Sequence, residues 1–365
     1  MVEFKGYALT KADRAAWNSL EVVEFEPKKF EDTDVEFAIT HCGLCGSDVH
    51  ILRQGWGDVA YTPLVVGHEI VGKVVRVGPK VTEFKAGDRV GVGAKVGSCG
   101  TCNRCTHDNE QYCTASVSAV VLRVPQNSRF PDGTPVQGGF ATAIRVDERF
   151  VFAIPEGIES KDAASMLCGG VTVFSPLRRN HIGPGTKVGV IGIGGLGHYA
   201  ILFAKALGAK VYAFTHSPNK QEDAKKLGAD VVVDTGVEDY QKPYFDTLDL
   251  IISTTNVFPK GVTYFTYTSM LTPCGKFVNV GLPDADKDMP SLQASDILWN
   301  GTFVGGSLVG SKRDVNEMLK VAAEKGVKPW VQELPMREYK TALEGVHNGD
   351  VRYRYVLKQD LVPVE

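Results

Sequence analysis

The chain has 365 residues, of which 43% are hydrophobic and 23% are charged, and its net charge at pH 7 is −3. This length predicts two domains with sizeable cores, and the charge gives no electrostatic basis for binding nucleic acid or an anionic membrane. No apolar run reaches the ~20 residues that a membrane-spanning helix needs, and the N-terminus has no apolar signal-peptide core. We therefore expect a soluble, cytoplasmic protein whose eight cysteines are mostly metal ligands and their neighbours.

The first 115 residues are rich in short β-type runs that glycine and proline interrupt. The clearest runs lie at 35–40, 69–77 and 88–92. Their alternation and β-branched residues predict the strands of a small barrel-like domain. Residues 114–139 are polar and contain proline and glycine, which indicates a surface loop. Residues 160–180 are typical of a helix with Ser160 as its N-cap.

Beyond residue 187, apolar strands alternate with helices. The expected strands lie at 188–191, 210–214, 231–233, 248–252, 276–280, 302–304 and 353–357. The expected helices lie at 198–207, 220–227 and 312–325. This alternation predicts a parallel sheet with helices on both faces, so the fold class is α/β with a β-rich second domain.

Three short motifs, far apart in the chain, hold the residues that a catalytic zinc ion needs. Cys45, His68 and Cys168 together supply two sulfurs and one nitrogen. Three protein ligands leave a fourth position open, which is the arrangement of a catalytic zinc site. Glu69 is either an alternative ligand or a nearby charge. The competing interpretation is that Cys45 and Cys168 are simply buried cysteines.

Polar residues close to the first cysteine ligand suit proton transfer. Ser47 can hydrogen-bond a substrate oxygen, and His50 can pass the proton to solvent because histidine titrates near neutral pH. Asp48 can orient His68 through its second ring nitrogen. The alternative for Ser47 and His50 is a turn cap and a surface imidazole. Trp56 either walls an apolar substrate pocket or packs in the core.

Four cysteines lie close together between residues 99 and 113. Two residues separate Cys99, Cys102 and Cys105 from one another, and seven more precede Cys113. Four sulfurs can close a tetrahedron and leave no open position, which predicts a structural zinc ion. Disulfides would require an oxidising compartment, and a nucleic-acid-binding zinc module would require basic surroundings, which this motif lacks.

A glycine-rich turn follows the strand at 188–191. The turn reads Gly192-Ile193-Gly194-Gly195-Leu196-Gly197 and opens a helix. In that context the glycines allow a tight turn and a close approach of the backbone to a pyrophosphate. The alternative is an ordinary strand–helix turn.

The end of the next strand indicates which dinucleotide binds. An NAD site would place an acidic residue there, whereas Thr215, His216, Ser217 and Lys220 occupy this segment. Two hydroxyls and a positive charge suit a 2′-phosphate, so we predict NADP(H). His216 either stacks on adenine or faces solvent.

These residues together resemble the zinc-dependent medium-chain alcohol dehydrogenases, and most of all the cinnamyl alcohol dehydrogenase branch with its fungal NADP-dependent enzymes of broad specificity. The resemblance covers nearly the whole chain. It rests on the four-cysteine set and on segments 45–50, 67–69, 168–170, 192–197, 215–220 and 350–354.

The resemblance implies a Rossmann domain at 160–308, inserted in a GroES-like catalytic domain formed by 1–159 and 309–365. It implies two zinc ions per chain, one catalytic and one structural, and a homodimer joined through the Rossmann sheets. It makes Glu69 a carboxylate that can replace a ligand on the catalytic zinc. The implied cofactor contacts are Ser47, Thr172, Thr254, Gly281, Ser307, Leu308, Val309 and Arg354.

The function expected from these features is NADP(H)-dependent interconversion of an alcohol and an aromatic or medium-chain aliphatic aldehyde. The alternatives are NADPH-dependent reduction of a conjugated alkene or iminium, and a non-catalytic NADPH-binding protein. A non-catalytic relative would be expected to have lost Cys45, Ser47 or His50, and all three are present. Because His216 and Asn219 stand where fungal relatives commonly carry arginine or lysine, the resemblance implies a weaker preference for NADP.

Overall fold

The computed structural model describes residues 2–119 and 128–363, which form two compact units. Unit 1 comprises Met1–Gly169, Ser311–Ala323 and Trp330–Glu365, and unit 2 comprises Gly170–Gly310 and Glu324–Pro329. The domain limits expected at residues 160 and 308 lie close to the points where the chain passes from one unit to the other, at Gly169–Gly170 and Gly310–Ser311. They stay a prediction. Residues 120–127, inside the loop expected at 114–139, lie outside the described residues.

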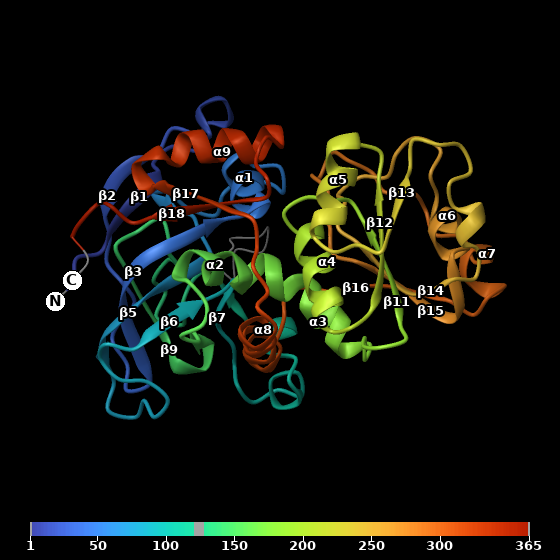
Figure 1. Cartoon of the computed structure of the whole chain (residues 1–365). Coiled ribbons are helices and arrows are strands. Elements are labelled where there is room, and N and C mark those ends of the chain that lie inside the picture. The colour runs from blue at the N-terminus through green and yellow to red at the C-terminus, as the bar shows by residue number, and fades with distance from the viewer. Residues whose placement is uncertain (1, 120–127, 364–365) are drawn as a thin grey trace. The chain divides into compact units, whose positions relative to one another are not determined.

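Unit 1 is organised around a largely antiparallel sheet with the order β10-β6-β5-β3-β18-β17, and β9 also pairs with β3. Its strands are β3 (Asp34–Leu44), β5 (Glu69–Val77), β6 (Arg89–Val92), β9 (Ala143–Asp147), β10 (Val151–Ala153), β17 (Val331–Pro335) and β18 (Arg354–Lys358). Figure 1 shows the red C-terminal strand β18 beside the blue β3, and β17 pairs with the other edge of β18. The two ends of the chain therefore build one sheet.

Two smaller sheets complete the β structure of unit 1. They have the orders β2-β1-β4 and β7-β8. Their strands are β1 (Lys5–Leu9), β2 (Glu21–Glu24), β4 (Leu64–Val65), β7 (Lys95–Gly97) and β8 (Val117–Ser118). The helices of this unit are α1 (Gly46–Leu52), α2 (Ser160–Ser165), α8 (Lys312–Lys325, which runs on into unit 2) and α9 (Tyr339–Asn348).

The helix expected over 160–180 is interrupted. It begins at Ser160, but the N-cap is Glu159, so the predicted N-cap is wrong by one position. After α2 the chain forms a π-helical turn over Met166–Gly170, and the α-helix resumes as α3 (Val171–Arg179). Wide turns of this kind inside helices are frequent at functional sites, and this one carries Cys168.

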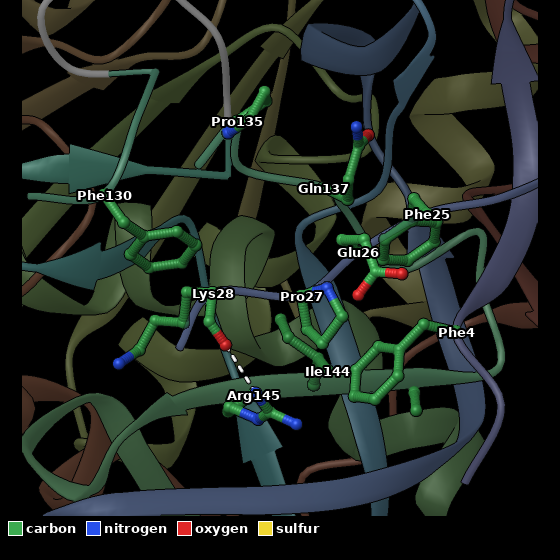
Figure 2. Close-up of a pocket in the computed structure, with 11 residues that line it drawn as sticks. Phe4, Phe25, Glu26, Pro27, Lys28, Phe130, Pro135, Gln137, Ile144 and Arg145 are labelled. Carbon is green, nitrogen blue, oxygen red and sulfur yellow. Dashed lines mark hydrogen bonds between the residues drawn. The ribbon is translucent and has the colours of Figure 1, made fainter. Parts of the chain in front are cut away.

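A small cavity in unit 1 lies among aromatic and basic side chains (Figure 2). Lys28 lies over the Phe130 ring and Arg145 over the Phe4 ring, and Arg145 donates a hydrogen bond to the Lys28 carbonyl at 2.5 Å. The cavity volume is about 20 Å³, which has room for little more than a water molecule. This cavity is therefore not a substrate or cofactor site.

Unit 2 contains a six-stranded parallel sheet with the order β13-β12-β11-β14-β15-β16. Its strands are β11 (Lys187–Ile191), β12 (Lys210–Thr215), β13 (Val231–Asp234), β14 (Leu248–Ser253), β15 (Leu271–Asn279) and β16 (Phe303–Gly306). Its helices are α3, α4 (Gly197–Ala206), α5 (Pro218–Lys226), α6 (Tyr264–Thr268) and α7 (Ser295–Leu298). Counted from β11, the strand order is 3-2-1-4-5-6, which is that of the doubly wound Rossmann fold. The expected fold class is confirmed.

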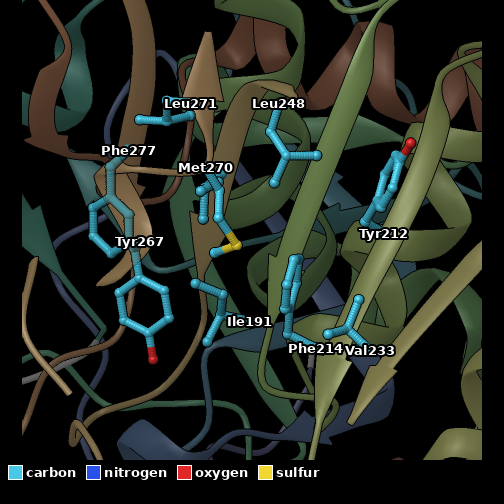
Figure 3. Close-up of a cluster of buried hydrophobic side chains, with 10 residues drawn as sticks. Ile191, Tyr212, Phe214, Val233, Leu248, Tyr267, Met270, Leu271 and Phe277 are labelled. Carbon is cyan, nitrogen blue, oxygen red and sulfur yellow. The ribbon is translucent and has the colours of Figure 1, made fainter. Parts of the chain in front are cut away.

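Buried side chains of unit 2 pack into a core beside the sheet, as Figure 3 shows. Phe214 of β12 and Ile191 of β11 belong to this core together with Met270, Tyr267 and Phe277. Strands of a parallel sheet are covered on both faces, so their sequences are continuous apolar runs. Across the described ranges, none of the helices combines the length and apolar character that crossing a bilayer demands.

Candidate active site

The residues expected to bind a catalytic zinc ion lie together in unit 1. One ligand atom from each of Cys45, His68, Glu69 and Cys168 lies within 4.8 Å of the others, and all four residues are buried. Cys45 precedes α1, Glu69 begins β5, and Cys168 lies in the π-helical turn. Two sulfurs, a nitrogen and a carboxylate oxygen therefore converge from three separate segments.

Two glycines make this convergence possible. Gly43 is paired with Glu69 across β3 and β5, and a Cβ atom at Gly43 would overlap the Glu69 carboxylate. Gly67 has a φ of +101°, and a Cβ atom there would lie 2.7 Å from the Phe140 ring. The turn before His68 therefore requires glycine for both its backbone conformation and its space.

Asp48 fixes the geometry of the cluster. This buried carboxylate accepts hydrogen bonds from Cys45 N at 2.9 Å, Gly67 N at 3.0 Å and His68 Nδ1 at 2.9 Å. The neutral form of His68 consequently carries its hydrogen on Nδ1, which leaves the lone pair on Nε2. Nε2 is buried and has no hydrogen-bond partner among the described residues, so a metal ion would satisfy it.

Charges in the cluster also suit a cation. The hydrogen bond from the Cys168 thiol lowers the pKa of Cys45 well below its ordinary value, and the same bond raises the pKa of Cys168. Burial opposes protonation of His68, but the Asp48 carboxylate raises the pKa of His68 well above its usual value, so a metal ion would bind Nε2 by displacing a proton. A thiolate is the form of cysteine that binds metals, so Cys45 is prepared to be a ligand.

Glu69 has one oxygen committed and one available. Its Oε1 accepts hydrogen bonds from Arg354 and from Gly169 N at 3.3 Å, whereas Oε2 is buried without a hydrogen-bond partner among the described residues. Burial raises the pKa of Glu69 to about 7, although Arg354 counteracts this. The Oε2 atom is thus available to a metal ion. Burial makes the negative charge of the Glu69 carboxylate energetically unfavourable in this site.

Arg354, which we expected among the cofactor contacts, donates to Glu69 at the metal-ligand cluster. Sequence reasoning did not foresee this pairing, because it arises from β18 lying beside β3. No local pattern in the sequence signals it. Contact between Arg354 and a cofactor stays a prediction.

The residues expected to move the proton lie on α1. The Ser47 hydroxyl lies 3.6 Å from the Cys45 sulfur, beside the ligand cluster. Ser47 and His50 are three residues apart, which places them on the same helix face. The His50 ring stacks on the Trp56 ring at 4.7 Å between centroids and 11° between planes. Trp56 therefore contacts the expected relay residue directly.

The four-cysteine cluster has the dimensions of a zinc–thiolate tetrahedron. Sulfur–sulfur distances among Cys99, Cys102, Cys105 and Cys113 are 3.5 to 3.9 Å. Zinc–sulfur bonds of about 2.3 Å would give a tetrahedral edge of about 3.8 Å. Backbone hydrogen bonds from Thr101 and Cys102 lower the pKa of the Cys99 thiol to about 6, which favours the ligating thiolate. The four residues therefore fit a structural zinc ion.

The glycine-rich turn in unit 2 has the shape of a pyrophosphate cradle. Gly192 has a φ of +83°, and a Cβ atom there would lie 2.6 Å from Thr255. A Cβ atom at Gly197 would overlap the Gly192 carbonyl, so α4 packs too closely on the turn for a larger residue. At Gly194, in contrast, a Cβ atom would meet nothing within 4 Å. That open face suits a ligand that approaches the backbone.

The end of β12 retains the features that the sequence suggested for NADP(H). Thr215 is buried and its hydroxyl accepts a hydrogen bond from Ser217 N at 3.3 Å. Ser217 and Lys220 are half-buried, and His216 is exposed. No acidic residue lies between 215 and 220. The structure places these residues beside one another at the carboxyl end of a strand, where dinucleotides bind in this fold.

The remaining expected cofactor contacts are distributed over unit 2. Thr254 donates to the carbonyls of Ile191 at 3.0 Å and Gly192 at 2.9 Å, so it supports the glycine-rich turn. A Cβ atom at Gly281 would overlap the Thr255 carbonyl. The others are Thr172, buried in α3, and Ser307, Leu308 and Val309, which follow β16. Their contact with a cofactor stays a prediction.

Comparison with known proteins supports this description. Residues 31–156 match the alcohol dehydrogenase GroES-like domain, and residues 195–324 match the zinc-binding dehydrogenase family. The chain is 42% identical over 362 residues to NADP-dependent alcohol dehydrogenase 6 of Saccharomyces cerevisiae, covering 97% of this chain and 96% of the relative.

Two solved structures of cinnamyl alcohol dehydrogenases are also similar. The Sorghum bicolor enzyme has a TM-score of 0.89 and 36% identity, with full coverage of both chains. The Helicobacter pylori structure, complexed with NADP(H), has a TM-score of 0.86 and 32% identity, covering 98% of each chain. The protein is therefore an oxidoreductase that belongs to the zinc-binding medium-chain alcohol dehydrogenases, as its sequence motifs suggested.

Proposed function

We propose that this protein is an NADP(H)-dependent alcohol dehydrogenase that works mainly as a reductase of aromatic and medium-chain aliphatic aldehydes. The observation that carries the proposal is the buried cluster of Cys45, His68 and Cys168, in which His68 Nε2 lacks a hydrogen-bond partner among the described residues. When bound, zinc supplies a Lewis acid for the substrate oxygen and NADPH supplies the hydride.

The chain's own residues hold the ligands and handle the proton. Asp48 keeps the His68 ring in the tautomer that leaves Nε2 available. The Ser47 hydroxyl, 3.6 Å from the Cys45 sulfur, would hydrogen-bond the developing alkoxide oxygen and give it the hydroxyl proton. His50 then returns a proton from solvent to Ser47, and its stacking on Trp56 holds the imidazole in place.

We further propose two zinc ions per chain, because the two ligand clusters differ in kind. Four sulfurs close the cluster at residues 99–113, whereas Cys45, His68 and Cys168 alone would leave a fourth position open in the other cluster. Cofactor preference follows from the end of β12, which lacks the acid of an NAD site. Similarity to an NADP-dependent relative supports the same choice.

A homodimer joined through the Rossmann sheets is part of the proposal. Strand β16 is the last in the sheet order, and apolar side chains near it are exposed. Trp299 is 81% exposed, Leu298 70% and Phe303 59%. Apolar side chains that gather beside an edge strand mark a surface for another chain. Sedimentation or light scattering should therefore report a dimer.

The test is reduction of cinnamaldehyde by purified protein with NADPH or NADH, followed by nicotinamide absorbance and product identification. We expect cinnamyl alcohol as the product, with faster turnover for NADPH. Replacing Cys168 with serine or His68 with alanine should abolish turnover while NADPH binding persists. Hydrocinnamaldehyde as the product would instead indicate reduction of the conjugated alkene. No turnover by protein that holds zinc and binds NADPH would contradict the proposed aldehyde reductase.

A further inference from the structure

The carbonyl of Gly194, in the middle of the glycine-rich turn, accepts two hydrogen bonds from one residue. His198 donates to it through its backbone N at 3.0 Å and through its ring Nδ1 at 3.3 Å. The backbone bond spans four residues, as in a helix, but its acceptor lies before the N-cap Leu196, so it ties the turn to the start of α4. The ring bond is an addition that only this side chain supplies, and it requires the hydrogen to lie on Nδ1.

The orientation of the Gly194 carbonyl determines where the next amide points. In a planar trans peptide, the C=O of one residue and the N–H of the following residue point in opposite directions. Because His198 holds the Gly194 carbonyl toward α4, the N–H of Gly195 is directed away from the helix. The turn is open at Gly194, where a Cβ atom would meet no atom within 4 Å. An anion at this end of α4 would meet an amide that is already oriented.

The imidazole is itself firmly held. His198 is fully buried, and its ring centroid lies 4.2 Å from that of Tyr199. Tyr199 is also fully buried and stacks on Phe203 at 5.9 Å. A donor that is locked in an aromatic core loses little conformational entropy when it makes its hydrogen bond. On the other side of the turn, Thr254 holds the Gly192 carbonyl in a similar way.

We propose that His198 is a positioning residue for the pyrophosphate of NADP(H), acting through the Gly194 carbonyl without touching the cofactor. This inference rests on the proposed function, since it takes the ligand of the turn to be a dinucleotide. It adds a residue within the core of unit 2 to those that determine cofactor affinity.

Substitution of His198 can separate positioning from general stability. In the His198→Leu variant the ring donor is lost, whereas in His198→Asn the amide nitrogen can occupy the place of Nδ1. Ile201→Ala is the matched control, because Ile201 is equally buried in the same helix and is not part of the His198–Tyr199–Phe203 stack. We would measure the dissociation constant of NADPH by fluorescence, that of adenosine 2′-monophosphate by competition, and the melting temperature of each variant.

His198→Leu should raise the dissociation constant of NADPH about threefold to tenfold, the effect of one neutral hydrogen bond. It should leave adenosine 2′-monophosphate unaffected, because that ligand has no pyrophosphate. His198→Asn should restore most of the NADPH affinity, and Ile201→Ala should lower only the melting temperature. Unchanged NADPH affinity in His198→Leu, or equal weakening of both ligands, would overturn the inference. Wild-type protein that binds neither ligand would contradict the proposed cofactor itself.

Discussion

Replacing Asp48 with asparagine should weaken zinc binding at the catalytic cluster and leave the four-cysteine cluster intact. The Asp48 carboxylate accepts from three donors, namely Cys45 N, Gly67 N and His68 Nδ1. Cys45 N uses one carboxylate oxygen, and the other two donors share the second. An asparagine amide has a single acceptor oxygen, so at least one of these donors would face an NH₂ group.

The size of the effect follows from burial. Asp48 is 1% exposed, so water cannot replace the lost acceptor. An unsatisfied buried donor costs about 1–3 kcal/mol. That energy corresponds to a factor of roughly 5 to 150, since each 1.4 kcal/mol is tenfold. Loss of the group that orients a histidine ligand typically costs about 10- to 100-fold in metal affinity, which agrees with this range.

The assay is equilibrium dialysis against buffered free zinc, with the metal content of wild type and variant measured at each concentration. Asp314→Asn is the matched control, because Asp314 is equally buried and accepts hydrogen bonds from Ser311 N at 3.0 Å and Ser311 Oγ at 3.1 Å. We expect Asp314→Asn to lower the melting temperature without weakening the catalytic zinc site. If Asp48→Asn bound catalytic zinc as tightly as wild type, or if both variants lost it equally, the orienting role of Asp48 would be refuted.

Three other predictions follow from the same structure. Cys102→Ser should reduce the zinc content from two ions per chain to one, measured by atomic emission, while the catalytic zinc affinity is unchanged. Arg354→Met should lower the free energy of unfolding in urea by about 3–5 kcal/mol, because it leaves Glu69 buried without its cation; replacing both residues with neutral ones should recover part of this loss. Burial lowers the pKa of His41, so the folded protein binds a proton less readily than the unfolded chain. Stability from this group is therefore complete above about pH 6.5 and is lost as pH falls, and His41→Gln should flatten the decline of the urea midpoint between about pH 7 and pH 5.

Elements with strong local signals were predicted well. The helix expected over 312–325 is observed over Lys312–Lys325, with Ser311 bonded to Asp314 at its start. The strands of unit 2 were predicted to within a few residues, apart from β15, which begins earlier. Their continuous apolar runs reflect burial on both faces. Helix α5 begins at Pro218 and not at Lys220, because proline at the first helical position is favourable.

Elements that depend on tertiary contacts were not predicted. The helix at 160–180 is broken at Met166–Gly170, and nothing in its apolar periodicity marks a π-helical turn there. Helix α9 was overlooked, although Gly349, with a φ of +74°, is a typical helix terminator. Strand β17 is short and half-exposed, and it is a strand because it pairs with β18. Its propensity alone could not establish it.

The spacing of cysteines in the sequence was enough to predict the four-cysteine cluster, but the geometry of the catalytic cluster could not be predicted in this way. All ligands of the four-cysteine cluster come from one loop, so residue spacing already brings the sulfurs within reach of one another. The catalytic cluster depends instead on the register of β5 against β3, in which Glu69 faces Gly43. A shift of this register by one residue would turn Glu69 to the opposite face of the sheet and away from Arg354. Only glycine at position 43 is small enough to leave room for the Glu69 carboxylate. Gly43 therefore belongs to the site as much as the ligands do, although no chemical property of glycine could have revealed it.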